Sequence, residues 1–279
     1  MTHSANTCSP SKELIVLKLG GSAITRKDGD HLLDRPLVEA IAKELAGIDS
    51  KLILVHGAGS FGHPVAKRYG IHQGYRERGQ LRGVTETKSS MLQLTMMLTE
   101  LLADHNVAVI PFLSSSCMVA SRGRLLRVDT EPFRMMLDLG FVPLCSGDVV
   151  ADVETGFSIV SGDQIAVYLA ERLNAARVIF GCDVDGVFDS DPKMNPHANL
   201  IRVITPRTLS EKVRSIGESA ATDVTKGMLG KINESVSLVS VGREVVILNL
   251  RRPGNLTRLI QGEDIECTRF IPDSRGPTA

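Results

Sequence analysis

Short apolar runs alternate with longer amphipathic segments along most of this chain. The apolar runs, rich in valine, isoleucine and leucine, predict β-strands at residues 14–19, 52–56, 107–110, 142–145, 177–182 and 244–248. Apolar positions at helical spacing predict helices at residues 35–47, 83–106, 131–139, 163–173 and 225–241. Residues 149–160, with Glu154-Thr155-Gly156 at their centre, predict a β-hairpin.

This alternation is typical of parallel strands joined by crossover helices. We therefore expect an α/β protein, a three-layer αβα sandwich built on a central, mainly parallel open sheet. The sequence contains no Pro/Gly/Ser-rich linker, internal repeat or low-complexity tract, so one continuous sheet shared by two lobes is the simplest architecture. Ligands of open α/β sheets bind at the carboxyl ends of the strands, and the loops there are the first place to look for a site.

Composition and charge narrow the class of protein. With 279 residues and 43% hydrophobic content, the chain can bury a sizeable core. Thirty-two basic residues balance thirty-two acidic ones, which leaves no overall field to hold nucleic acid or an anionic membrane surface. No apolar stretch approaches the roughly 20 residues of a membrane-spanning helix, and the N-terminus has no signal-like apolar segment. We expect a cytoplasmic protein whose five scattered cysteines are free thiols.

Three predicted loops beside strands or helices are rich in glycine or small polar residues, namely Gly20-Gly21-Ser22, Gly57-Ala58-Gly59-Ser60 and Ser161-Gly162-Asp163. Glycine lets backbone N–H groups surround phosphate oxygens. Tight strand-to-helix turns also need glycine, so one such loop indicates little, whereas three in one α/β chain favour an anion site. The P-loop pattern is absent, as is G-x-G-x-x-G at the first strand-to-helix turn. Lys18, near the end of a predicted buried strand, needs an anionic partner.

The sequence around these loops resembles the amino acid kinase superfamily. KLGGSAIT at residues 18–25 is similar to the opening motif of that superfamily. HGAGSFGH at residues 56–63 resembles the second glycine loop of the isopentenyl phosphate kinases, whose closing histidine is typical of kinases that phosphorylate a phosphate monoester. SGDQIA at 161–166, DVDGVFDSDP at 183–192 and TDVTKGMLGKI at 222–232 extend the resemblance over roughly residues 13–270.

The resemblance implies a role for each matching residue. The expected catalytic residues are the cations on the phosphates and the carboxylate that positions the lysines, namely Lys18, Lys27, His63, Asp163 and Lys231. The acceptor would contact Ala58, Gly59, Ser60, Gly62, His63 and Gly162, with Met91 and Leu94 along its organic tail. The nucleotide would contact Lys18, Gly20, Gly21, Ser22, Asp183, Asp185, Gly186, Val187, Asp191, Gly227 and Lys231.

Several of these residues also have a purely structural interpretation. Asp163 stands where a helix N-cap is expected, and Met91 and Leu94 lie on an apolar stripe that is usually core. His63 is expected to donate a hydrogen bond, best as a protonated imidazole. Two positions depart from the usual pattern: Lys226 stands where relatives have a glycine before Gly227, and Ala58 where many have glycine.

The resemblance also implies that different segments of the chain have different functions. Residues 1–12 and 272–279 would be flexible ends, residues 13–160 a lobe that binds the acceptor phosphate and dimerises, and residues 161–271 a lobe that binds the nucleotide. No protein ligand is expected for Mg²⁺, which would arrive with ATP and be held by phosphate oxygens.

The activity implied by the resemblance is a phosphotransferase reaction. ATP would phosphorylate isopentenyl phosphate, or a similar small isoprenoid monophosphate, to the diphosphate by in-line transfer to an acceptor phosphate oxygen. This reaction belongs to isoprenoid biosynthesis and the mevalonate pathway, and the enzyme would be a homodimer. Fosfomycin kinase or another small-molecule kinase of the superfamily is an alternative, and a non-catalytic nucleotide-binding protein is a second.

Overall fold

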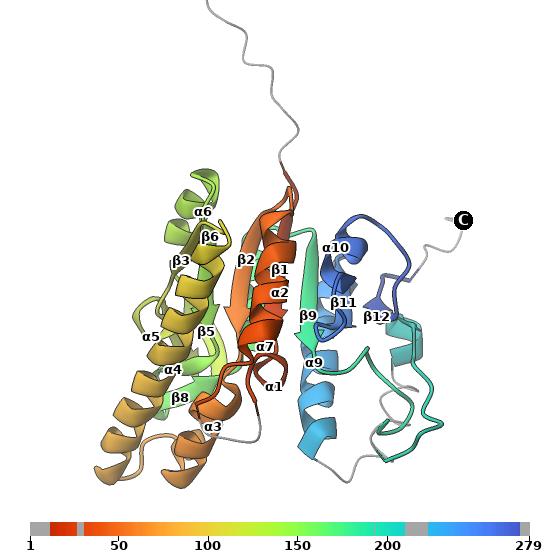
Figure 1. Ribbon diagram of the computed structural model, residues 1–279. Helices are drawn as coiled ribbons and strands as arrows, with labels where there is room; N and C mark the ends of the chain where they lie inside the picture. Colours follow the sequence, from red (N-terminus) through yellow and green to blue (C-terminus); the bar gives the residue numbers. More distant parts are fainter. Residues whose placement is uncertain (1–11, 27–30, 193, 210–222, 274–279) are drawn as a thin grey trace, which may run out of the picture.

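The computed structural model describes residues 12–26, 31–192, 194–209 and 223–273. Its centre is an eight-stranded sheet with the order β10-β12-β11-β9-β1-β2-β6-β3 (Figure 1). Every neighbouring pair is parallel except β11 with β12. In chain order the strands are β1 (Leu14–Leu19), β2 (Lys51–His56), β3 (Val109–Pro111), β6 (Val142–Ser146), β9 (Arg177–Cys182), β10 (Val203–Ile204), β11 (Glu244–Asn249) and β12 (Cys267–Phe270). The predicted large, mainly parallel sheet is confirmed.

Helices cover both faces of this sheet and make it the middle of three layers (Figure 1). One face packs on α2 (Arg35–Ala46), α4 (Gly79–Asp104) and α10 (Asn255–Ile260), and the other on α6 (Glu131–Asp138), α7 (Gly162–Arg172) and α9 (Asp223–Ser240). The alternating residues of β1 divide accordingly: Ile15 and Leu17 join the first apolar cluster, and Val16 joins the second. A strand buried on both faces needs this continuous apolar sequence.

A second sheet of four strands has the order β5-β4-β7-β8. The predicted hairpin at residues 149–160 is β7 (Asp148–Asp152) and β8 (Gly156–Val160). The other hairpin, β4 (Met118–Ser121) with β5 (Arg124–Val128), was not predicted. Its two-residue turn places Arg122 at φ 49° and Gly123 at φ 76°, and an arginine at the first left-handed position lacks the usual Asn-Gly or Asp-Gly signal.

Several short elements complete the fold. They are α1 (Gly21–Ile24), α3 (Gly59–Arg68), the 3-10 helix η1 (Ile71–Gln73) and α5 (Ser114–Cys117). The predicted glycine loop at residues 57–60 overlaps the start of α3, a helix that was not predicted and that contains the poor helix formers Gly62 and Pro64. The long helix α4 begins at Gly79 and not at the predicted Gly83, which is a packing position where a Cβ would overlap the ring of Tyr69. Among the described residues, no helix combines the length and apolar character needed to cross a bilayer.

Asp152 joins the turns of the two hairpins. Its Oδ1 accepts hydrogen bonds from the backbone N–H of Arg122 at 3.1 Å, Glu154 at 2.9 Å and Thr155 at 2.9 Å, and its Oδ2 accepts from Gly123 at 2.9 Å. Burial opposes ionisation of this carboxyl, but the hydrogen bonds from the two turns outweigh it and lower the pKa of Asp152 well below its ordinary value. A single carboxylate therefore fixes the two hairpins relative to each other.

We predict that Asp152→Asn lowers the free energy of unfolding at neutral pH by about 2 kcal/mol, because an amide nitrogen cannot accept from Gly123. The lowered folded pKa means that the stabilisation is complete above the ordinary value of 3.8 and is lost as the pH falls below it. Denaturant unfolding at several pH values should show the difference between wild type and variant shrinking in acid. Asp104→Asn, at an exposed position, is the control; an equal effect of both variants would contradict the account.

Candidate active site

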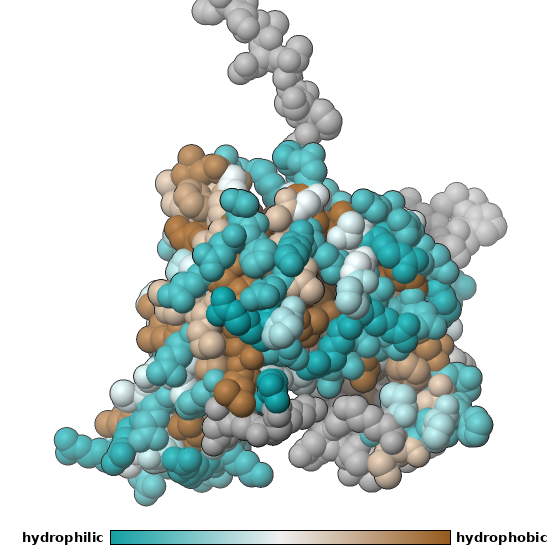
Figure 2. Space-filling view, viewed as in Figure 1, coloured by the Kyte–Doolittle hydropathy of each residue, from teal (hydrophilic) through white to brown (hydrophobic). Residues whose placement is uncertain are grey.

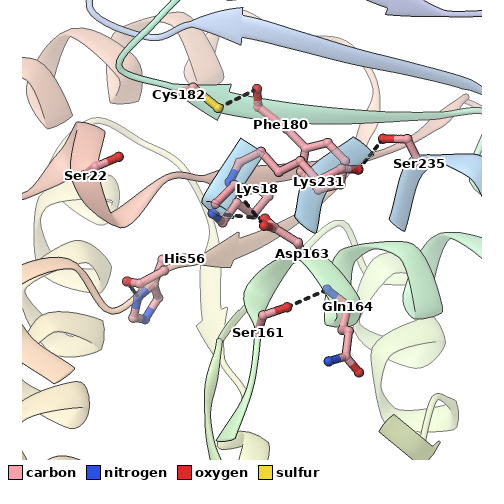
Figure 3. A network of polar contacts seen from close by, with 12 residues as sticks. Lys18, Ser22, His56, Ser161, Asp163, Gln164, Phe180, Cys182, Lys231 and Ser235 are labelled. Carbon is pink, nitrogen blue, oxygen red and sulfur yellow. Dashed lines mark hydrogen bonds and ion pairs between the residues drawn. The ribbon is translucent and has the colours of Figure 1, made fainter. Parts of the chain in front are cut away.

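The carboxyl ends of three neighbouring strands and the start of α7 meet at one edge of the main sheet. Lys18 lies one residue before the end of β1, His56 ends β2 and Cys182 ends β9. Asp163 lies in the first turn of α7, and Lys231 reaches the same place from α9 (Figure 3). The strand order β9-β1-β2 explains why residues so distant in sequence meet there.

A buried carboxylate lies between two lysines at this edge. Asp163 Oδ1 is 3.0 Å from Lys18 Nζ, and Asp163 Oδ2 is 3.2 Å from Lys231 Nζ (Figure 3). The side chains are only 7%, 13% and 13% exposed for Lys18, Asp163 and Lys231. Burial raises the pKa of Asp163, but the charges of the two lysines outweigh burial and lower that pKa overall. These three groups together carry one net positive charge, with the carboxylate of Asp183 near Lys231, and the two ammonium groups favour binding of an anion.

Asp163 is not the N-cap that its position suggested. The N-cap of α7 is Ser161, whose hydroxyl accepts a hydrogen bond from the backbone N–H of Gln164 at 3.1 Å. The carboxylate of Asp163 is thereby available for the two lysines. Gly162 lies between these two residues, and a Cβ there would be 3.3 Å from the carbonyl oxygen of His56 and 3.4 Å from Lys18 Cε.

The glycine loops approach one another backbone to backbone. Gly20 donates a hydrogen bond to the carbonyl oxygen of Gly181 at 2.8 Å, and a Cβ on Gly20 would lie 2.5 Å from that oxygen. A Cβ on Gly21 would overlap the backbone nitrogen of Gly59, so the first and second loops also touch. These glycines are needed for close packing of the loops as well as for access to a ligand.

Thr25, to which sequence reasoning gave no role, ties the first two glycine loops together. Its buried Oγ1 donates to the carbonyl oxygen of Gly21 at 2.7 Å and accepts from the backbone N–H of Ser60 at 3.1 Å. The available signal was its place at the end of the KLGGSAIT motif. Within the described part of the chain, the N–H groups of Ala58 and Gly59, at the start of α3, have no hydrogen-bond partner.

His63 follows one turn later on α3 with an exposed side chain. Desolvation by the surrounding protein, and then the charge of Lys18, lower its pKa below the ordinary 6.5. This lowered pKa disfavours the protonated imidazole in the ligand-free protein, and the predicted role of His63 as a hydrogen-bond donor stays a prediction. A neutral ring still carries one N–H that can donate a hydrogen bond.

The predicted acceptor residues on α3 and α4 lie close together. A Cβ on Gly62 would be 2.8 Å from Ala58 Cβ and 2.9 Å from Met91 Sδ, so α4 packs directly on the second glycine loop. Met91 and Leu94 are both buried, and Leu94 belongs to the apolar cluster under α4. Leu94 thus has the core role that its helical spacing suggested.

The predicted nucleotide residues divide into two groups. Ser22 donates to Asp183 at 3.1 Å, and the carbonyl oxygen of Gly227 accepts from Lys231 at 3.5 Å, so these residues adjoin the lysine cluster. Asp185 instead pairs with Arg252 at 2.6 Å. The remaining predicted residues lie farther along the loop after β9: Gly186 and Val187 contact Thr268 of β12, and the carbonyl oxygen of Asp191 accepts hydrogen bonds from Met194 and Asn195. Lys27 lies outside the described residues.

The described residues include no cluster of three or more His, Cys, Asp or Glu side chains that could hold a metal ion. Both oxygens of Asp163 face lysines, which makes this carboxylate a poor ligand for Mg²⁺. The described side chains of this site therefore fit Mg²⁺ only if a phosphorylated ligand supplies most of its oxygen ligands.

Comparisons with known proteins show which proteins this chain resembles. The profile of the amino acid kinase family matches residues 13–249. The isopentenyl phosphate kinase of Methanothermobacter thermautotrophicus is 39% identical over 265 residues, which cover 92% of this chain and 98% of the relative. The isopentenyl phosphate kinase of Arabidopsis thaliana is 33% identical over 268 residues, covering 88% of this chain and 80% of that protein. A glutamate 5-kinase of Streptococcus uberis is 26% identical over 260 residues, covering 90% and 92%.

Solved structures show the same relationship. X-ray structures of isopentenyl phosphate kinase superpose with a TM-score of 0.80 at 37% identity, covering 92% of this chain and 99% of the other. A product complex of the Thermoplasma acidophilum isopentenyl phosphate kinase gives 0.72 at 29% identity, with the same coverage. A UMP kinase from Ureaplasma parvum, at 0.63 and 18% identity over 94% of this chain and 100% of that chain, shares the fold.

We predict that Asp163→Asn lowers the free energy of unfolding by about 3 kcal/mol, because two buried ammonium groups lose their shared counter-charge. Pyrophosphate should restore much of that loss, since its oxygens supply negative charge to the lysines. Denaturant unfolding with and without pyrophosphate measures both effects, and Glu171→Gln, exposed on the same helix, is the control. Full wild-type stability of Asp163→Asn without an added anion would contradict the account.

Proposed function

This chain belongs to the amino acid kinase family, and on that basis we propose that it transfers the γ-phosphoryl group of ATP to isopentenyl phosphate. An oxygen of the acceptor phosphate attacks the γ-phosphorus, and the bond from that phosphorus to the β–γ bridging oxygen breaks. The products are ADP and isopentenyl diphosphate. Relatives of 32–39% identity named isopentenyl phosphate kinase support this acceptor.

The observation that carries the proposal is the net positive cluster of Lys18, Asp163 and Lys231 beside two glycine loops. Two phosphate groups must meet for this reaction, and like charges about 4 Å apart repel by roughly 4 kcal/mol at an effective dielectric near 20. Buried ammonium groups reduce this repulsion without having to reorganise during transfer. Asp163 pairs with both lysines and holds their ammonium groups at the same place.

The second glycine loop is the proposed acceptor site. The N–H groups of Ala58 and Gly59, which have no hydrogen-bond partner among the described residues, lie at the start of α3, where the helix dipole also favours an anion. Ser60, Gly62 and Gly162 complete the predicted contacts, and Met91 adjoins them from α4. The acceptor phosphate carries its own nucleophilic oxygen, so His63 is needed as a hydrogen-bond donor and not as a base.

The nucleotide would lie on the other side of the lysines. We assign its phosphates to the first glycine loop and Ser22, with Asp183 and Gly227 nearby, and Lys27 to the γ-phosphate. Asp185, Gly186, Val187 and Asp191 stay predicted contacts of the base and ribose. In this proposal residues 13–160 bind most of the acceptor and residues 161–271 most of the nucleotide, while the first glycine loop reaches the nucleotide's phosphates and Gly162 reaches the acceptor.

Mg²⁺, bound to the triphosphate of ATP, would supply further charge neutralisation.

A homodimer is proposed through residues 13–160. The exposed apolar side chains Leu92, Met96 and Met97 on α4 support it, as does the apolar surface along the side formed by α4 and α6 (Figure 2). A cytoplasmic place in the mevalonate pathway follows from the same resemblance.

The alternatives have less support. The relatives named glutamate 5-kinase are 26–27% identical, and a carboxylate acceptor would leave His63 without its predicted phosphate. A non-catalytic nucleotide-binding protein has no need for the buried lysine pair and its carboxylate together. Fosfomycin kinase differs from the proposal only in a phosphonate acceptor.

The direct test is an ADP-release assay with a panel of acceptors. We expect isopentenyl phosphate to give the highest kcat/KM, with dimethylallyl phosphate next and fosfomycin, UMP and glutamate at least tenfold lower, because only the first two combine a phosphate with a short apolar tail. Higher kcat/KM for fosfomycin than for either isoprenoid phosphate would replace the proposal with the phosphonate alternative.

His63→Ala tests the acceptor assignment separately. We predict a loss of roughly 100-fold in kcat/KM for isopentenyl phosphate, since a donor to a charged transition state is removed, with the affinity for an ATP analogue unchanged. Calorimetry with the analogue and steady-state kinetics measure the two quantities. His72→Ala, exposed in η1, is the matched control; near-normal turnover by His63→Ala would remove the assignment.

A further inference from the structure

His56 is a fully buried histidine for which the reaction described above has no use. It ends β2 directly before the second glycine loop, and its ring has two polar neighbours. Nδ1 lies 3.1 Å from the carbonyl oxygen of Gly57, and Nε2 lies 2.9 Å from Thr95 Oγ1 on α4. Burial lowers the pKa of His56 to about 4, the Gly57 carbonyl opposes this and Lys18 reinforces it. The ring is therefore neutral at neutral pH and carries one N–H.

The neighbours decide which nitrogen holds that proton. A carbonyl oxygen can only accept, so the Gly57 contact needs a proton on Nδ1. The hydroxyl of Thr95 can donate to Nε2 or to the carbonyl oxygen of Met91, which is also at 2.9 Å. If the proton were on Nε2, two acceptors, the Nδ1 lone pair and the Gly57 oxygen, would face each other in a buried site. Leaving these acceptors without a donor costs free energy. The Nδ1–H form satisfies both contacts.

This hydrogen bond fixes the peptide between Gly57 and Ala58. The N–H of Gly57 is bonded to the carbonyl oxygen of Leu19 at 2.9 Å, and its C=O is held by His56. In a planar trans peptide the C=O and the following N–H point in opposite directions, so the N–H of Ala58 is directed away from the buried ring. A Cβ on Gly57 would lie 3.6 Å from Lys18 Nζ, and this peptide therefore borders the lysine cluster.

We propose that His56 is a positioning residue that aims the N–H of Ala58 at the acceptor phosphate by holding the Gly57 carbonyl with its Nδ1–H. The inference rests on the proposed function, in which this N–H binds the acceptor. Glycine has little barrier to a rotation of the adjoining peptide, so without His56 the loop can turn its carbonyl oxygen toward the anion. His56 thus acts through Gly57 and does not contact the substrate itself.

Three substitutions separate the two ring nitrogens. The amide nitrogen of His56→Asn occupies nearly the place of Nδ1, that of His56→Gln the place of Nε2, and His56→Leu keeps the volume with no donor. We expect His56→Leu and His56→Gln to raise the KM for isopentenyl phosphate roughly 10- to 100-fold, the effect of one hydrogen bond to a charged group. His56→Asn should stay within about threefold of wild type, and the KM for ATP should change little in all three.

A purely structural role would give a different result. Rescue by Gln instead of Asn, equal KM values in all variants, or parallel rises in the KM for ATP would each overturn the proposal. Thermal unfolding of each variant shows whether it is folded. If the variants do not fold, NMR of the ligand-free wild-type protein with labelled histidine identifies the tautomer: Nδ1–H supports the proposal and Nε2–H overturns it. This measurement needs no substrate, so it stays informative if wild type fails to phosphorylate any isoprenoid phosphate, which would contradict the proposed function alone.

Discussion

The carboxylate of Asp163 between the ammonium groups of Lys18 and Lys231 is the interaction on which the site depends. Neither lysine could stay buried and charged alone, and one carboxylate cannot neutralise both. The excess positive charge is therefore held at a fixed place where β1, α7 and α9 converge. The parallel sheet makes this possible because its strand order brings the ends of β9, β1 and β2 to one edge.

The glycine loops add fixed backbone N–H groups beside the charged cluster. Gly20 lets the first glycine loop approach the end of β9, and Gly21 lets it touch the second loop at Gly59. Thr25 links these two loops through a single hydroxyl. His56 sits beneath the second loop and has a contact with its first carbonyl. Phosphoryl transfer requires positioning and neutralisation more than covalent chemistry. A site made of fixed amides and a shared counter-charge meets those requirements.

Sequence patterns predicted the central strands closely, because strands buried on both faces must be apolar throughout; β1 and β9 have the predicted bounds. Sequence patterns gave wrong predictions where the residue types disfavour the local structure that tertiary packing imposes. The helix α3 contains Gly62 and Pro64, and the β4–β5 turn uses Arg122 in a left-handed conformation. The resemblance implied roles for Lys18, Asp163 and Lys231. Asp163 and Lys231 are 68 positions apart in the sequence, so their ion pair becomes visible only in the folded structure. Thr25 and His56 act through backbone groups, which residue type alone does not reveal.

The most direct test of the central claim is a crystal structure with isopentenyl phosphate and a non-hydrolysable ATP analogue. The account predicts phosphate oxygens within hydrogen-bond distance of Lys18 Nζ and Lys231 Nζ, with Asp163 still pairing both lysines and the acceptor phosphate on the N–H of Ala58. Ligands bound elsewhere, with the lysine cluster in contact only with protein, would contradict it.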